Sequence, residues 1–234
     1  MNRIITIISF FCIALSSLAQ DDWLYEQCED TCKHIHGIDL SHYQGDVFWQ
    51  AVGDNRKMAY VYLKATEGGD NIDSRYADNI RMAKAAGLKV GSYHFFRPKT
   101  AIHLQLANFT AQCRPEDQDL IPMIDIETTA KLSEEAFTDS LMSFLALIEE
   151  YYHQKPLLYT GRNFYNKYLS GGLVDEYKLM IAMYNTDEEP VLIDDRDITM
   201  WQYTGKGSIN GVKGYVDKSR FVGKHGLREL RFRR

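Results

Sequence analysis

Two acidic side chains end an apolar stretch near the middle of the chain, and their spacing suits acid–base chemistry. In Ile121-Pro122-Met123-Ile124-Asp125-Ile126-Glu127 the acids are two positions apart. Alternate side chains of a strand share one face at a repeat of about 6.6 Å, so Asp125 and Glu127 point the same way, and Ile124 and Ile126 point into a packing layer. Burying two acids is costly unless they have partners or a chemical task. Their repulsion raises one pKa, which suits a general acid near neutral pH; the alternative is a salt-bridged pair at a strand end.

The elements that carry these acids alternate between strands and helices. The sequence predicts strands over residues 36–41, 59–65, 88–95, 120–127, 156–160, 178–184, 198–204 and 212–217. It predicts helices over residues 46–52 with Asp46 as cap, from Asp73 or Ser74 to 87, 100–113, 133–152 with Ser133 as cap, and 163–171. Such alternation is typical of parallel strands with right-handed crossovers. Since the last three strands follow one another with little helix between them, we expect a single closed or nearly closed α/β barrel of reduced size, of the type (β/α)5(β)3.

In such barrels the chemistry lies at the C-terminal ends of the strands. Asp39 and Asp217 come from the first and last predicted strands, which are neighbours in a closed barrel, so we expect both in one pocket with Asp125 and Glu127. Taken singly, each could instead be a turn or capping residue. The candidates for binding substrate are Tyr43, Lys64, Glu67, Tyr93, Phe95, Tyr159, Tyr184, Trp201 and Gln202. Packing is the alternative role for the aromatic residues, but a rim rich in carboxylates and aromatics points to glycoside chemistry.

The composition is that of a globular protein, and the first residues are typical of a secretory signal. The chain has 234 residues, is 45% hydrophobic and carries a formal charge of −5, which provides no positive field for nucleic acid. Arg3 precedes an apolar run over residues 4–15, and Ser17-Leu18-Ala19 fits a cleavage site. We expect a signal peptide over residues 1–19, an extension over 20–34, the catalytic barrel over 35–223 and a basic tail over 224–234. These features predict a monomer, exported to the periplasm or beyond the cell, with no membrane association after cleavage.

Features at the two ends of the chain allow more than one interpretation. A frayed, solvated tail is favoured over docking on anionic wall polymer for the segment with Lys224, Arg228, Arg231, Arg233 and Arg234. In an oxidising compartment one disulfide is expected, and all three pairings remain open among Cys28, Cys32 and Cys113. His34 and His36 form a His-x-His pair of the kind that metal-dependent barrel hydrolases use, although it precedes the end of its strand. We expect no metal and no cofactor.

Eight short motifs follow one another in the order of the predicted strands. They are HGIDLS at 36–41, LKATEG at 63–68, GSYHF at 91–95, DIE at 125–127, YTG at 159–161, IAMY at 181–184, WQYT at 201–204 and GYVD at 214–217. Together they resemble glycoside hydrolase family 25, the Chalaropsis-type lysozymes. The resemblance covers residues 36–221, nearly all of the chain that would remain after signal cleavage.

The resemblance implies a flattened barrel and an N-acetylmuramidase, which cuts the β-1,4 bond between N-acetylmuramic acid and N-acetylglucosamine in peptidoglycan glycan strands. It implies Glu127 as the proton donor and Asp125, Asp39 and Asp217 as the other pocket acids. Our hypothesis is retaining hydrolysis assisted by the 2-acetamido group of the substrate, which Asp125 orients; a direct Asp nucleophile or base is the alternative. A metal-dependent hydrolase and a non-catalytic wall-binding module are the rival functions.

The sequence departs from the family pattern at two places. The family often has Trp at the start of the sixth strand, where this chain has Leu179-Met180. The closing motif usually continues Asp-x-Asn, where this chain has Asp217-Lys218-Ser219. Both departures concern substrate preference rather than the chemistry.

Overall fold

The computed structural model describes residues 36–233, and the expected signal peptide and extension, with Cys28, Cys32 and His34, lie outside the described residues. The strands are β1 (His36–Leu40), β2 (Met58–Glu67), β3 (Asn71–Ile72), β4 (Lys89–Phe95), β5 (Met123–Asp125), β6 (Leu157–Gly161), β7 (Lys178–Ala182), β8 (Met200–Gly207) and β9 (Val216–Phe221). The α-helices are α2 (Trp49–Gly53), α3 (Tyr76–Ala85), α4 (Ile102–Gln112), α5 (Glu134–Tyr152) and α6 (Arg162–Tyr168). Short 3-10 helices are η1 (His42–Gln44), η2 (Pro115–Asp117) and η3 (Leu227–Leu230).

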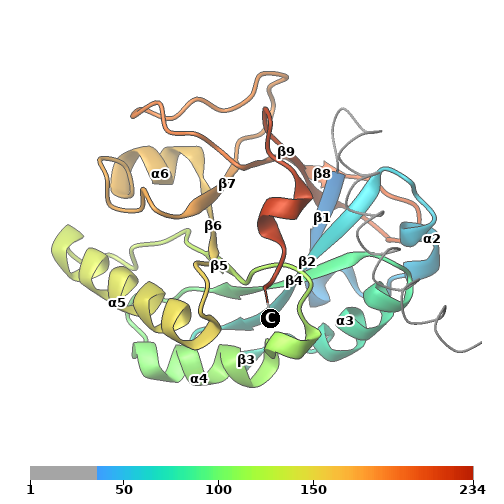
Figure 1. Cartoon of the computed structure of the whole chain (residues 1–234), viewed down its shortest axis with the longest axis horizontal. Coiled ribbons are helices and arrows are strands. Elements are labelled where there is room, and N and C mark those ends of the chain that lie inside the picture. The colour runs from blue at the N-terminus through green and yellow to red at the C-terminus, as the bar shows by residue number, and fades with distance from the viewer. Residues whose placement is uncertain (1–35, 234) are drawn as a thin grey trace, which may run out of the picture.

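Eight of these strands close into a barrel, which confirms the predicted fold class. Strand β1 pairs in parallel with β2 and antiparallel with β9, and this pairing joins the two ends of the sheet. Strand β9 also runs antiparallel to β8, whereas β2, β4, β5, β6, β7 and β8 pair in parallel in that order. The two-residue strand β3 is an addition that the sequence did not predict, and it pairs antiparallel with the end of β2. Figure 1 shows the helices α3, α4, α5 and α6 on the outside of the ring of strands.

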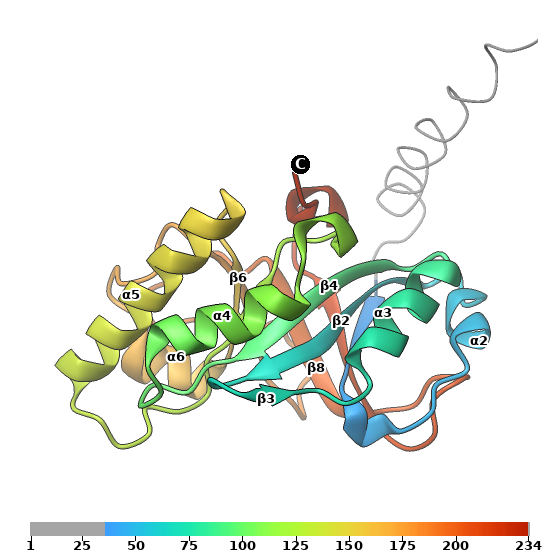
Figure 2. The same ribbon diagram turned by 90° about the horizontal axis from the view of Figure 1, so that it is seen from below.

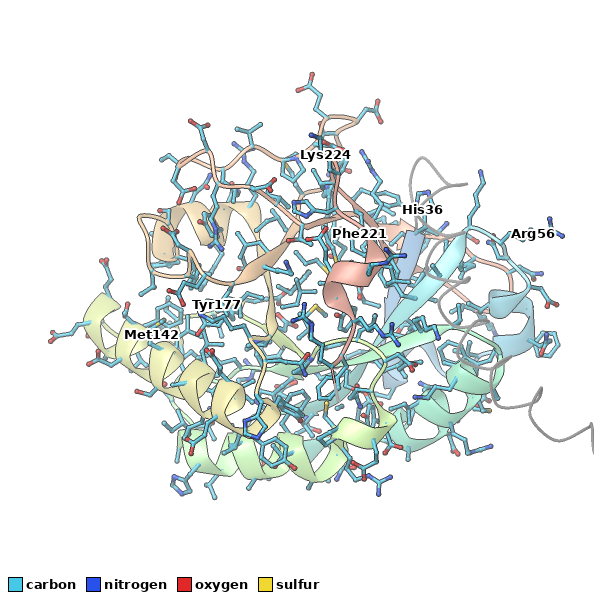
Figure 3. All side chains as sticks on the ribbon, viewed as in Figure 1. His36, Arg56, Met142, Tyr177, Phe221 and Lys224 are labelled. Atoms are coloured by element: carbon cyan, nitrogen blue, oxygen red, sulfur yellow. The ribbon has the colours of Figure 1, made fainter. Side chains whose placement is uncertain are left out.

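The strands bury two apolar layers because successive side chains point to opposite faces. The outer layer lies between the sheet and the helices, and includes Ile38, Val61, Ile124, Leu158, Ile181, Phe109 and Phe144. The inner layer fills the barrel, and includes Tyr60, Tyr62, Met123, Met180, Met200 and Phe221. Figure 3 shows side chains filling the middle of the ring around Phe221. Among residues 36–233, no helix combines the length and apolar character that crossing a membrane requires.

Two tyrosines of β2 occupy the barrel interior by lying over glycines of the neighbouring strands. Tyr60 is the register partner of Gly37 on β1, and Tyr62 is the partner of Gly91 on β4. The buried hydroxyls are paired: Tyr60 with the Ser219 hydroxyl at 3.0 Å, and Tyr62 with the Ile121 carbonyl oxygen at 3.1 Å. The glycines therefore provide the space for large side chains beneath the site.

Gly37→Ala is expected to lower the free energy of unfolding by about 1–3 kcal/mol, the range for overpacking a core. The new Cβ would lie 2.0 Å from the Cε2 atom of Tyr60, so the ring or the strand must move. Urea unfolding of the variant measures the effect. The matched control is Gly161→Ala, where nothing lies within 4 Å of an added Cβ and φ is −73°. Equal unfolding midpoints for the two variants would contradict the expectation.

The C-terminal segment differs from the expected frayed tail, because residues 224–233 close the barrel end opposite the predicted site. Leu227 and Leu230 of η3 are fully buried and belong to the inner layer. The Ile121 amide donates to the Leu230 carbonyl at 2.7 Å, and Phe232 is 7% exposed. Figure 2 shows η3 at one end of the barrel, with η1 and β3, which follow strands β1 and β2, at the other. The apolar residues between the basic ones drive this packing, so the predicted boundary at residue 223 does not mark the end of the folded unit.

Two strand boundaries differ from the prediction for identifiable backbone reasons. The last barrel strand spans Val216–Phe221 instead of 212–217, since Gly211 and Gly214 adopt φ values of 98° and 92° and turn the chain first. Strand β5 spans only Met123–Asp125 within the predicted 120–127. Pro122 lacks the N–H that a ladder needs.

Two of the three predicted helix caps are corrected by the structure. Ser133 caps α5 as predicted, because its hydroxyl accepts from the Ala136 amide at 3.2 Å. Asp46 does not cap α2, which begins at Trp49; its carboxylate instead pairs with Arg75 at 2.6 Å. Helix α3 begins at Tyr76, after Arg75, and Asp73 accepts from the Arg75 amide in the preceding turn at 2.9 Å.

Candidate active site

A cavity of about 230 Å³ lies at the C-terminal ends of the parallel barrel strands. Its lining contains all four predicted acids, Asp39, Asp125, Glu127 and Asp217. Six of the predicted binding residues also line it: Tyr43, Lys64, Tyr93, Phe95, Tyr159 and Gln202. The closed barrel therefore gathers residues that lie almost 180 positions apart in the sequence into one pocket.

The paired acids alternate with packing residues in the way their spacing predicted. Met123 and Asp125 on β5 line the cavity, and Glu127 continues the alternation beyond the last residue of the strand. Ile124 and Ile126 are fully buried in the outer layer. Asp125 is 7% exposed, and its Oδ1 atom has no hydrogen-bond partner among the described residues. A buried carboxyl oxygen without a partner is unusual, because buried polar groups are normally hydrogen-bonded.

Asp39 and Asp217 meet where the barrel closes. They are register partners across the antiparallel pair of β1 and β9, so their side chains lie on the same face of neighbouring strands. Asp39 is 6% exposed and Asp217 is half-buried. Like charges directly opposite one another are unfavourable, which favours retention of a proton by this pair.

A buried amide connects Asp39 to two tyrosines of other strands and loops. Gln202 of β8 donates from Nε2 to Asp39 Oδ2 at 2.9 Å. Its Oε1 atom accepts from the Tyr159 hydroxyl at 2.9 Å and from the Tyr184 hydroxyl. The three strands β1, β6 and β8 are thereby joined through side chains inside the site.

Two cations stand at the rim of the cavity. Lys64 Nζ donates to Glu67 Oε2 at 2.7 Å, and Arg97 Nε donates to Glu67 Oε1 at 2.9 Å. Both cations also contact the ring of Phe95, whose centroid is 5.3 Å from Lys64 Nζ and 4.4 Å from Arg97 Cζ. One carboxylate faces two cations here, so the rim carries net positive charge close to the acids inside.

Burial is the largest influence on all four pocket acids, and it raises their pKa values. The pKa of Asp39 rises to about 8, because burial and the charge of Asp217 outweigh the hydrogen bond from Gln202. Burial and the charge of Glu127 raise the pKa of Asp125 well above its ordinary range and also raise that of Asp217. Burial raises the pKa of Glu127 despite the opposing influence of the nearby Tyr159 hydroxyl and of the charges of Lys64 and Arg97. The site can therefore hold protons near neutral pH, as general-acid chemistry requires.

Comparison with known proteins agrees with this geometry. The sequence model for glycosyl hydrolases family 25 matches residues 38–212. The chain belongs to glycosyl hydrolase family 25. It is 30% identical to the uncharacterized protein YegX of Escherichia coli strain K12 over 193 residues, which are 81% of this chain and 70% of that protein. It is 28% identical to Lysozyme M1 of Streptomyces globisporus over 201 residues, 81% of this chain and 68% of that protein.

The fold of the family is shared as well. A bacterial lysozyme from Streptomyces coelicolor superposes with a TM-score of 0.75 at 28% identity, covering 84% of this chain and 94% of that structure. Family 25 membership confirms the resemblance that the strand-end motifs indicated. It makes the protein a glycoside hydrolase.

Three of the predicted binding residues lie outside the lining of the family 25 cavity. Trp201 is 3% exposed, and its Nε1 atom donates to the Met183 carbonyl at 2.7 Å. It precedes Gln202 on β8, so when the amide faces the cavity the indole faces away. The Tyr184 hydroxyl donates to Gln202 Oε1, and Glu67 is paired with Lys64 and Arg97.

The cavity also uses residues that the sequence analysis missed. Its lining includes Leu40, Ser41, Gln44 and Met123. Ser41 and Gln44 form a capping box around η1, in which the Ser41 amide donates to Gln44 Oε1 at 3.0 Å. The Ser-x-x-Gln spacing is the sequence signal for this box, and the box places Tyr43, which is 81% exposed, at the mouth of the cavity.

The two departures from the family pattern lie away from the lining. Leu179 and Met180 are fully buried, in the outer and inner layers respectively, and neither contributes to the cavity. Ser219 is fully buried and binds the Tyr60 hydroxyl. In this chain both positions therefore serve the packing of the barrel.

The residues of the rival metal site and of the disulfide are only partly described. His36 Nδ1 lies 3.0 Å from the Tyr203 hydroxyl. Within residues 36–233, no three His, Cys, Asp or Glu side chains are grouped as a metal would require. Cys113 is a buried free thiol, so neither pairing that uses it is formed in this structure.

Asp39→Asn is expected to stabilise the protein more at pH 8 than at pH 4. The pKa of Asp39 is about 8 in the folded protein against 3.8 for the free side chain. At a pH below both pKa values, Asp39 is protonated in the folded and in the unfolded state, so the substitution changes the free energy of unfolding little. Between the two pKa values Asp39 ionises in the unfolded state but stays protonated in the folded state, so the free energy of unfolding of the wild type falls as pH rises. Thermal unfolding at both pH values measures the difference. The control is Asp139→Asn, at an exposed position of α5, and a pH-independent effect of Asp39→Asn would contradict the prediction.

Proposed function

We propose that the protein is an exported N-acetylmuramidase that hydrolyses the β-1,4 bond between N-acetylmuramic acid and N-acetylglucosamine in peptidoglycan. The observation that carries the proposal is the convergence of Asp39, Asp125, Glu127 and Asp217 on one cavity of a family 25 barrel. Lysozyme M1 and the autolytic lysozyme of Clostridium acetobutylicum, which is 33% identical over 190 residues, support this choice of substrate. Export follows from the predicted signal peptide and from the location of such a substrate outside the cytoplasm.

In the proposed mechanism Glu127 protonates the glycosidic oxygen and then activates water. Its raised pKa and its position beside the buried Asp125 suit both roles. The carbonyl oxygen of the 2-acetamido group attacks the anomeric carbon, so that the configuration is retained. Asp125 holds the amide N–H and stabilises the positive charge of the cyclic intermediate. Asp39 and Asp217 bind the sugar from the β1–β9 side of the cavity.

The aromatic and cationic rim would bind the rest of the glycan. Tyr43, Tyr93, Phe95 and Tyr159 offer faces or hydroxyls to sugar rings. Lys64 also lines the cavity, and its charge opposes the rise in the pKa of Glu127.

A digest of purified peptidoglycan tests the proposed function. The protein lacking residues 1–19 is incubated with sacculi, with and without EDTA, and the fragments are reduced with borohydride and identified by mass spectrometry. Fragments ending in reduced muramic acid, with no effect of EDTA, are expected. Fragments ending in reduced glucosamine would show that the protein cleaves a different glycosidic bond. Released peptides that disappear when EDTA is added would indicate a metal-dependent hydrolase. Wall binding without any product would indicate a binding module.

A further inference from the structure

The amide of Gln202 is held in one orientation by its neighbours. Gln202 is 3% exposed, and its Oε1 atom receives two phenol hydroxyls, those of Tyr159 and Tyr184. An ionised carboxylate has no hydrogen to donate, so the orientation that pairs Gln202 with Asp39 in both protonation states of the acid has the amide nitrogen toward Asp39 and the oxygen toward the tyrosines. The nitrogen then faces Asp39, to which it donates at 2.9 Å.

This arrangement makes the two oxygens of Asp39 different. Oδ2 accepts the hydrogen bond from Gln202. Oδ1 is buried beside the cavity and has no hydrogen-bond partner among the described residues. When Asp39 carries a proton, Oδ1 is therefore the oxygen that bears it, since a proton on Oδ2 would point at the N–H of Gln202.

We propose that Gln202 is a positioning residue, which acts through Asp39 by keeping Oδ1–H directed into the cavity as a hydrogen-bond donor to an uncharged oxygen of the bound sugar. The inference rests on the proposed muramidase activity and reassigns Gln202 from substrate contact to support of Asp39. The ligand chemistry is a hydroxyl or amide carbonyl oxygen, because an ionised ligand would not need a neutral donor. Asp217, directly opposite on β9, supplies the second carboxyl of the pair.

Several groups face Asp39 and determine how it responds to pH. They are Asp217 on β9, Gln202 on β8, Tyr60 on β2, Tyr93 on β4, Asp125 on β5 and Tyr184 after β7. Burial and Asp217 favour the protonated form, and only the hydrogen bond from Gln202 opposes them. Loss of that bond therefore raises the pKa of Asp39 above its value of about 8 in the intact protein.

Two variants of Gln202 separate positioning from substrate contact. Gln202→Met removes the hydrogen bond at nearly constant volume, and Gln202→Glu keeps an acceptor for the tyrosines but loses the donor to Asp39. Each is expected to lower kcat/KM by about 2- to 10-fold, the equivalent of one hydrogen bond between uncharged groups, chiefly through kcat. The alkaline limb of the pH–activity profile should move to higher pH in Gln202→Met. Gln118→Met is the matched control, because Gln118 is a buried amide bonded to Ser92 and Tyr76, away from the cavity.

A titration of Asp39 itself gives a result that does not depend on turnover. The ¹³C signal of the Asp39 carboxyl, assigned with Asp39→Asn, is followed with pH in the wild type, Gln202→Met and Gln118→Met. An upward shift in Gln202→Met alone supports the inference even if the wild type leaves peptidoglycan intact, an outcome that would overturn only the proposed function. Gln202→Leu takes the place of Gln202→Met in the titration if the latter does not fold, because it also removes the hydrogen bond without adding a charge. An unchanged Asp39 titration, a rise in KM with kcat unchanged, or wild-type kinetics in Gln202→Glu would each overturn the inference.

Discussion

Replacing Glu127 by Gln is expected to lower kcat for peptidoglycan hydrolysis by about 10²- to 10⁴-fold, the usual contribution of a general acid. The amide has nearly the same shape but cannot release a proton to the glycosidic oxygen. Since Glu127 comes after β5 on the cavity side and is not part of a buried core cluster, the substitution leaves the packing of the barrel intact. KM should change little. Initial rates of reducing-end release from sacculi measure kcat and KM. Unfolding followed by circular dichroism checks that the packing of the barrel is unchanged.

The control for this substitution is Glu150→Gln, at an exposed position of α5 on the outside of the barrel. It repeats the chemical change away from the cavity and is expected to retain wild-type kcat. If Glu127→Gln kept full activity on intact wall, Glu127 could not be the proton donor. The proton would then have to come from another pocket acid, and Asp125 is the first candidate because its pKa is raised by burial and by Glu127 itself.

Asp125→Asn is expected to lower kcat by about 10²- to 10³-fold, the usual loss when one electrostatic contact to a transition state is removed. In the substrate-assisted mechanism Asp125 orients the acetamido N–H and stabilises the charge of the cyclic intermediate. Its Oδ1 atom is buried and unpartnered, so it has no other hydrogen bond to satisfy in the described structure. Initial rates of reducing-end release measure the loss of kcat. NMR identifies the configuration of the first anomer that is released.

A thiazoline analogue of the cyclic intermediate distinguishes the two mechanisms for Asp125. If the acetamido group is the nucleophile, the analogue inhibits the wild type, and Asp125→Asn weakens inhibition in parallel with kcat/KM. If Asp125 is a direct nucleophile, the substitution abolishes activity and the analogue has no special affinity. Inversion of the anomeric configuration would contradict both retaining mechanisms. It would assign Asp125 as the general base that activates the attacking water.

Much of the site was predictable because it depends on local periodicity. The alternation of Ile124, Asp125, Ile126 and Glu127 places acids on one face of any strand, whichever fold contains it. The alternation of strands and helices then predicts a barrel with its chemistry at the C-terminal strand ends. The four acids could therefore be assigned to one pocket before their contacts were known.

The same reasoning failed where a local pattern has two solutions. Trp201 and Gln202 are adjacent on β8, and only one of them can face the cavity. The sequence does not say which, and the contacts with Met183 and Asp39 decide it. The position of β9 was missed because turns at Gly211 and Gly214 end one segment and begin the next.

Sequence alone determined the acids, their shared face, the succession of strands along the chain and the α/β-barrel class of the fold, since each follows from residue type and spacing along the chain. Only the tertiary structure decided how distant segments meet. It placed Asp39 opposite Asp217, turned the Gln202 amide between Tyr159 and Asp39, and packed η3 into the far end of the barrel. These contacts depend on barrel closure, which brings β1 beside β9 and leaves one end of the apolar interior to be covered. The pattern of neighbouring residues does not specify which strands pair or in which register, because the pairing is made between segments that are remote in sequence.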